Sequence, residues 1–98
     1  MFIVSLNYLC DIETVEKYVG IHRQFMVPYF SEGVFIAAGR KEPRTGGIIL
    51  AQGISKSELQ KVIKQDPFYQ HNIAKYDVIE FIPSKTIEGF PAAKAITN

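Results

Sequence analysis

The sequence is poor in the features that mark secreted, membrane-bound and nucleic-acid-binding proteins. It contains one cysteine, Cys10, so an internal disulfide is excluded and a reducing cytoplasm is the expected compartment. No apolar run approaches the ~20 residues that a membrane-spanning helix needs, and the first residues lack the basic segment of a secretory signal. The formal net charge is +1 at pH 7, which gives no general attraction to nucleic acid or to anionic membranes. We therefore expect a cytoplasmic protein with neither of these partners.

What the sequence does contain is the composition of one small globular domain. The chain has 98 residues, of which 47% are hydrophobic and 21% are charged, and these are ordinary values for such a domain. A chain of this length can bury one core, and association with a second copy would add buried area. We predict a single domain over residues 1–98, in which residues 83–98 form an irregular tail because they show no clear period.

Hydrophobic periodicity predicts four strands and a long first helix. Alternating or β-branched apolar stretches indicate strands at residues 2–9, 34–39, 47–53 and 76–82. Apolar residues at steps of three and four indicate a helix that Asp11 caps and that runs to about Ser31. Pro28 is out of place in this helix because it cannot donate a hydrogen bond to the carbonyl of Gln24. We expect a kink or early fraying there.

A short second helix is predicted between the third and fourth strands. Ser55 and Glu58 form a capping box that begins it. The Asp66-Pro67 step ends it, because a residue before proline is pushed out of helical geometry. Residues 67–75 are then predicted to be a loop.

The order strand, helix, strand, strand, helix, strand predicts the α+β class. Two split βαβ units with a central hairpin give a ferredoxin-like βαββαβ sandwich, with a four-stranded antiparallel sheet and both helices on one face. The strands at 34–39 and 76–82 carry apolar residues on both sides, whereas a sheet face exposed to water alternates with polar residues. A second copy packed on the uncovered face would explain this pattern, so we expect a homodimer or a higher homo-oligomer. The alternative is that these short strands are merely more hydrophobic than they need to be.

One histidine and one aspartate are the best candidates for chemistry. His22 lies on the apolar stripe of the first helix, and a buried imidazole needs a hydrogen-bond partner. Antiparallel packing of the two helices brings the middle of the first near the end of the second, where Pro67 holds Asp66. We predict a His22–Asp66 pair that Phe68 and Tyr69 wall from bulk water. Such a pair fixes the ring tautomer and suits proton transfer, although a plain structural ion pair looks the same in sequence.

Three segments, HRQFM, GVFIAAGRKEPRTGGIIL and QDPF, together resemble the YciI-like (YCII-related) family of the dimeric α+β barrel superfamily. The resemblance runs from the first strand to about residue 82 and implies the same ferredoxin-like fold. It implies an active centre whose His–Asp pair is carried here by His22 and Asp66, and a pocket at the end of the second strand, near Gly39. Members often have Ser-Gly-Pro at that strand end, whereas this chain has Ala38-Gly39-Arg40, so a step that needs the serine hydroxyl is lost.

One branch of the family resembles dehydrochlorinases of chlorinated, hydroxylated aromatics, for which elimination by a histidine base fits. We do not transfer that substrate to this chain from the resemblance.

The other candidate residues each allow two interpretations. Arg40 and Arg44, next to Lys41, either bind an anionic group of a substrate or belong to a solvated basic turn. Tyr8 either lines the cavity or packs with its hydroxyl at the edge. The predicted substrate-binding set is Gly39, Arg40, Arg44, Phe68 and Tyr8.

No metal and no cofactor are predicted. The histidines, Asp66 and Cys10 are possible ligand types, but their spacing matches no metal motif. Cys10 has no base beside it in sequence and is interpreted as structural.

Two functions from different classes follow from these features. The leading hypothesis is a cofactor-free enzyme of the lyase or isomerase type, which uses His22 and Asp66 for proton transfer on a small cyclic oxygenated molecule. The rival is a non-catalytic small-molecule-binding or assembly module in which the same pair is structural. An enzyme needs His22 to reach an open cavity of a few hundred Å3, on the order of known ligand sites, whereas a sealed imidazole favours the module.

Overall fold

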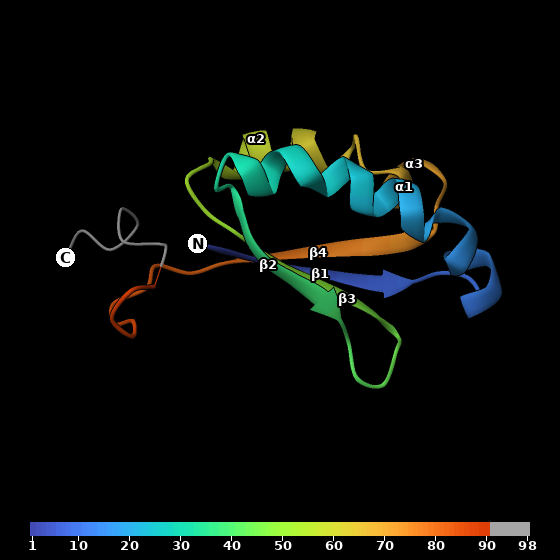
Figure 1. The fold of residues 1–98 in the computed structure, drawn as a ribbon, viewed down its shortest axis with the longest axis horizontal. Helices are drawn as coiled ribbons and strands as arrows, with labels where there is room; N and C mark the ends of the chain where they lie inside the picture. The colour runs from blue at the N-terminus through green and yellow to red at the C-terminus, as the bar shows by residue number, and fades with distance from the viewer. Residues whose placement is uncertain (91–98) are drawn as a thin grey trace.

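The computed structural model describes residues 1–90, which form one sheet with all helices on one face (Figure 1). The elements, in chain order, are β1 (Phe2–Tyr8), α1 (Ile12–Ser31), β2 (Phe35–Arg40), β3 (Gly46–Ala51), α2 (Lys56–Ile63), α3 (Pro67–Gln70) and β4 (Ala74–Glu80). The predicted α+β sandwich with a four-stranded antiparallel sheet is confirmed. The predicted tail over 83–98 shows no helix or strand up to residue 90, and the remainder, 91–98, lies outside the described residues.

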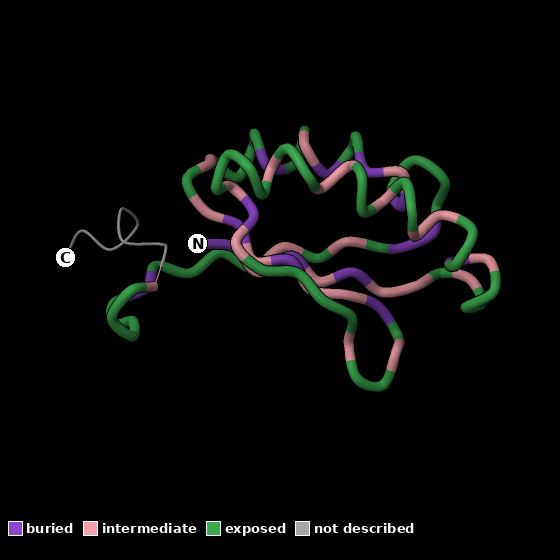
Figure 2. Tube along the Cα trace, in the orientation of Figure 1, coloured by how far each residue is buried: buried purple, intermediate pink, exposed green. Residues whose placement is uncertain are grey.

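The sheet has the strand order β2-β3-β1-β4, and all its pairings are antiparallel. β1 therefore lies between β3 and β4 in the middle of the sheet, as the split βαβ topology requires. Its alternate residues Phe2, Val4 and Leu6 are buried beneath the helices, which reflects the period of two in a strand. The buried core lies between the two layers (Figure 2) and consists of Phe2, Val4, Leu6, Val15, Phe35, Ile49, Ala51, Leu59, Ile63, Phe68, Ile73 and Ala74.

Helix α1 begins at a side-chain cap and continues through its proline. The Asp11 side chain accepts a hydrogen bond of 2.9 Å from the Thr14 amide, and hydrogen bonding by the Thr14 side chain and then by this amide lowers the pKa of the Asp11 carboxyl. Pro28 lies inside the helix, which ends at Ser31, so the expected early fraying is wrong. The Pro28 carbonyl still accepts a hydrogen bond of 3.0 Å from the Glu32 amide, which closes the last turn of the helix.

The segment after α2 is helical where a loop was expected. Asp66 is the N-cap of α3, and one of its carboxylate oxygens, Oδ1, accepts the Phe68 amide at 2.9 Å. Pro67 occupies the first turn, where a missing N–H costs nothing and the fixed φ suits the helix. The Asp-Pro step therefore both separates α3 from α2 and begins α3, which corrects the prediction of a loop over residues 67–75.

The sheet face away from the helices is apolar at one end. Ile3 pairs with Leu50 of β3 on one side and with Ile79 of β4 on the other, which places a row of aliphatic side chains across three strands. Ile79 is 56% exposed and Phe81 is 40% exposed. The apolar second face is therefore present, and the copy expected to cover it stays a prediction. Within residues 1–90, no helix is long and apolar enough to cross a membrane.

Candidate active site

His22 and Asp66, which are distant in sequence, are hydrogen-bonded in the fold. Helix α1 carries the imidazole and the start of α3 carries the carboxylate, with 2.8 Å between His22 Nδ1 and Asp66 Oδ1. The imidazole is 12% exposed and the carboxylate only 1%. The contact predicted from helix packing is therefore present. Because Nδ1 donates to a carboxylate in this geometry, Nε2 is the ring nitrogen left without a proton in the neutral ring.

The buried carboxylate of Asp66 is held by donors from three elements. Oδ1 accepts the His22 ring N–H and the Phe68 amide, while Oδ2 accepts the hydroxyl of Tyr76 at 2.5 Å. Charge-assisted hydrogen bonds of this kind offset the cost of burying a carboxylate. Tyr76, on β4, is absent from the sequence prediction. Its alternation with Val78 on the helix-facing side of the strand is the signal that could have indicated it.

Phe68 fixes the plane of the imidazole. Its ring stacks on the His22 ring with 4.0 Å between centroids and 2° between planes. Tyr69, which was expected to wall the pair alongside it, lies instead against Tyr76 and is 43% exposed. Only Phe68 therefore has the predicted wall position beside the cavity of His22.

His22 lines an open cavity of about 350 Å3 between α1 and the ends of β2 and β3. The lining residues include all five of the predicted substrate-binding residues, Tyr8, Gly39, Arg40, Arg44 and Phe68. Ala38, at the position where related sequences often have serine, lines the same cavity. The fold thus gathers the predicted residues around His22, and their roles in binding stay predictions.

The hairpin between β2 and β3 brings Arg40 and Arg44 to this cavity. The Tyr8 amide donates to the Thr45 carbonyl at 2.9 Å, which ties the hairpin to the end of β1. Gly46 allows this approach because a Cβ atom there would overlap the Leu6 carbonyl. Lys41 turns away from the cavity, since its Nζ donates to Asn7 Oδ1 at 2.8 Å.

Arg44 and Glu16 form an ion pair across the cavity. Arg44 Nη1 lies 2.5 Å from Glu16 Oε1, and this contact is the main cause of a raised pKa for the guanidinium. Arg44 Nε is buried and has no hydrogen-bond partner among residues 1–90. This N–H is enclosed by protein atoms, whereas the Arg44 side chain as a whole is 29% exposed. Glu16 is absent from the predicted site, and the hairpin path that pairs it with Arg44 has no local signal in the sequence.

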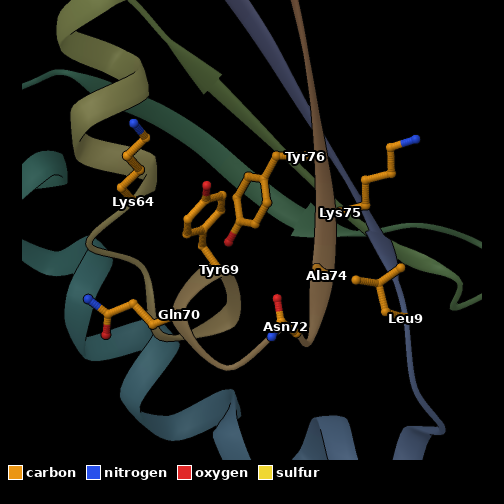
Figure 3. Close-up of a pocket in the computed structure, with 8 residues that line it drawn as sticks. All are labelled: Leu9, Lys64, Tyr69, Gln70, Asn72, Ala74, Lys75 and Tyr76. Atoms are coloured by element: carbon orange, nitrogen blue, oxygen red, sulfur yellow. The ribbon is translucent and has the colours of Figure 1, made fainter.

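A second, larger cavity of about 580 Å3 lies beside α3 and β4 (Figure 3). Tyr69 and Tyr76 line it together with Leu9, Lys64, Gln70, Asn72, Ala74 and Lys75. His22 is not among its lining residues, although Tyr76 is hydrogen-bonded to the partner of His22.

The part of the chain that the structure describes contains no group of three or more His, Cys, Asp or Glu side chains able to hold a metal ion. Cys10 is partly buried, and its sulfur lies 3.9 Å from the Ile73 carbonyl.

The fold and the cavity define a small α+β sandwich protein with a buried carboxylate behind a histidine. A model of the YCII-related domain matches residues 1–82, and the chain belongs to this family. The comparison with curated proteins finds no match.

Among solved structures, the chain is similar to 5-chloro-2-hydroxyhydroquinone dehydrochlorinase (TftG) from Burkholderia phenoliruptrix AC1100, in complex with 2,5-dihydroxybenzoquinone. The TM-score is 0.69 at 13% sequence identity, and the match covers 83% of this chain and 93% of that one. At this identity the similarity shows a shared fold.

Proposed function

We propose that this protein is an enzyme of the lyase or isomerase type, in which His22 transfers a proton and Asp66 orients it. The observation that carries the proposal is that one imidazole both bonds a buried carboxylate and lines an open cavity. A histidine with only a structural role has no need to line an open cavity. The volume of about 350 Å3 suits a small cyclic molecule.

The bond from Nδ1 to Asp66 leaves the lone pair of His22 Nε2 as the base. It takes a proton from a C–H or O–H group that neighbouring oxygens make acidic, and Asp66 stabilises the imidazolium that forms. In an isomerisation, the imidazolium returns the proton to another atom of the substrate. In an elimination, the electron pair of the bond to the removed proton becomes a new π bond, and the leaving group departs with the electron pair of its own bond.

Arg44 would bind an ionised oxygen of the substrate. Its side chain lines the cavity and is 29% exposed, and a guanidinium matches a carboxylate or enolate oxygen better than an ammonium does. Arg40 lines the same cavity and adds positive charge, while Glu16 is already engaged by Arg44. We therefore favour a substrate that is anionic at neutral pH.

The solved relative supplies the first compounds to try. Its printed name gives a chlorinated hydroxyhydroquinone as substrate, and its bound ligand is a dihydroxybenzoquinone. Both are small, cyclic and oxygenated, and such compounds ionise readily, which is the chemistry that His22 and Arg44 would serve.

The test is turnover and binding with these two compounds. Purified protein is mixed with 5-chloro-2-hydroxyhydroquinone without oxygen, and chloride release is followed for the wild type and for His22→Ala. Binding of 2,5-dihydroxybenzoquinone is followed by shifts of the backbone amide signals that surround His22. Chloride release by the wild type that is abolished in His22→Ala supports the proposed enzyme. If the wild type binds the compound but neither releases chloride nor exchanges substrate hydrogen, the binding module is supported instead.

We also propose that the working form is a homodimer joined through the open sheet face. The row of Ile3, Leu50 and Ile79 makes one end of that face apolar, and sheet-on-sheet packing of a second copy would remove it from water. Sedimentation is expected to show a dimer for the wild type and a monomer for Ile79→Lys. The control is Lys75→Gln, which lies at the polar end of β4 and should stay dimeric. A monomeric wild type would overturn this part of the proposal.

A further inference from the structure

We propose that Tyr76 is a positioning residue, whose hydroxyl holds the second oxygen of Asp66 and thereby keeps His22 in one tautomer with Nε2 free. This role rests on the proposed proton transfer by His22. The contact is the 2.5 Å hydrogen bond from Tyr76 Oη to Asp66 Oδ2.

The need for this bond follows from how the carboxylate is held. The Phe68 amide and the His22 ring both bond Oδ1. The terminal torsion of an aspartate is broad, and a turn about the Cβ–Cγ bond moves both oxygens together. Within residues 1–90, Tyr76 is the only side chain with a bond to Oδ2. It therefore opposes such a turn from the side opposite His22 and adds a third donor to the group that orients the imidazole.

Tyr76 is suited to be a permanent donor. Burial raises the pKa of its hydroxyl above the ordinary range, and the neighbouring charge of Asp66 and the hydrogen bond raise it further. The hydroxyl therefore keeps its proton wherever the imidazole can act as a base. The other side chains that titrate or carry charge and that contact this pair or line the larger cavity with Tyr76 are His22 on α1, Tyr69 on α3, Lys64 at the end of α2 and Lys75 on β4.

Tyr76 acts through Asp66 because it has no access to the substrate. It comes from β4 and is absent from the residues that line the cavity of His22. It lines the larger cavity instead, where Figure 3 shows its ring next to that of Tyr69. The two rings meet edge to face at 5.9 Å, a packing contact that a phenylalanine at position 76 would keep.

The experiment is a comparison of Tyr76→Phe with the wild type by nitrogen NMR of the His22 ring. The two ring nitrogens of a neutral imidazole have different shifts, which report the tautomer directly. We expect a single form protonated on Nδ1 in the wild type. In Tyr76→Phe, the ratio of this form to the other is expected to fall by about tenfold or more, given the usual strength of a hydrogen bond to a charged group.

The matched control is Tyr69→Phe, which removes a hydroxyl from the same larger cavity without touching Asp66. It should leave the His22 spectrum unchanged. If folded Tyr76→Phe also keeps the wild-type tautomer, the positioning role is wrong and the hydroxyl serves stability alone.

A second measurement covers the case in which Tyr76→Phe does not fold. In Asp66→Asn, which retains Tyr76, the carbon chemical shift of Tyr76 Cζ should differ from that of the wild type, because the acceptor of the hydroxyl loses its charge. An unmoved signal would overturn the proposal.

The kinetic test, on 5-chloro-2-hydroxyhydroquinone, separates the two proposals. Tyr76→Phe is expected to lower kcat by about tenfold with KM unchanged. If the wild type does not act on this compound, the proposed function fails there, while the tautomer measurement still decides the role of Tyr76.

Discussion

Each of the two cavities is lined by a different hydrogen-bond partner of the same carboxylate, Asp66. His22, bonded to Oδ1 of Asp66, lines the cavity of about 350 Å3, and Tyr76, bonded to Oδ2, lines the one of about 580 Å3. The smaller cavity has an imidazole, three arginines and one glutamate in its wall, whereas the larger has two tyrosines and two lysines.

The difference between them lies in chemistry more than in size. In the smaller cavity, an imidazole, the guanidinium of Arg44 and a stacked aromatic ring line one space. In the larger one, the hydroxyl of Tyr76 is already bonded to Asp66. We therefore place the reaction in the smaller cavity, and the following variants test that assignment.

The largest effect is expected for His22→Ala. Loss of the base should lower kcat for chloride release by about 10²–10⁴-fold, while Lys64→Ala in the larger cavity should leave kcat unchanged. Urea unfolding of both variants accompanies the assay. If the wild type shows no turnover and His22→Ala is much less stable than the wild type, the pair is structural, because the variant leaves Asp66 buried without its partner.

Asp66→Asn should have the next largest effect. The amide oxygen can still accept from the Phe68 amide, but the negative charge that stabilises the imidazolium is gone. We expect kcat to fall by roughly 10–100-fold and the free energy of unfolding to fall by about 1–3 kcal/mol. Activity equal to that of the wild type would show that the smaller cavity does not depend on the carboxylate behind it.

Arg44→Gln should weaken binding more than it slows chemistry. The dissociation constant for 2,5-dihydroxybenzoquinone is expected to rise by about tenfold, as for one hydrogen bond to a charged group, and titration calorimetry measures it. Glu16→Gln should tighten binding several-fold, because it frees the guanidinium from its ion pair. Lys75→Gln in the larger cavity is the control. An equal loss of affinity in this variant would indicate that the ligand binds in the larger cavity, away from His22.

The smallest effect is expected for Ala38→Ser. The change restores a hydroxyl that related sequences often carry, inside the cavity of His22. If His22 and Asp66 suffice for the reaction, kcat should change by less than about tenfold, the value of one neutral hydrogen bond. A larger gain would show that the missing hydroxyl limits this chain.

The fold was predictable because its signals are local. The period of two in residues 2–9 and the period of three to four after Asp11 reflect which side chains face the core, and the order of the elements then limits the topology. The His22–Asp66 contact was predictable for the same reason, since it follows from how two helices pack on one sheet. The short α3 was missed because four residues are too few to show a period, although Asp66-Pro67 is a cap signal.

The rest of the site depends on contacts that no local pattern encodes. The pairing of Glu16 with Arg44 requires the path of the hairpin over the end of β1. The bond between Tyr76 and Asp66 requires the register of β4 against β1, which carries the tyrosine beneath α3. In both cases the residue type was visible in the sequence, and its partner was not.

Asp66 performs two tasks with one oxygen, since Oδ1 receives both the amide that starts α3 and the ring of His22. The cap needs only an acceptor, which asparagine or serine also supplies, whereas the proposed chemistry needs the charge. A lineage that abandoned the chemistry would still be under selection to retain an acceptor at this position for the sake of the helix. Replacement of the aspartate by another capping residue would accordingly mark a descendant that has lost the chemistry and kept the fold.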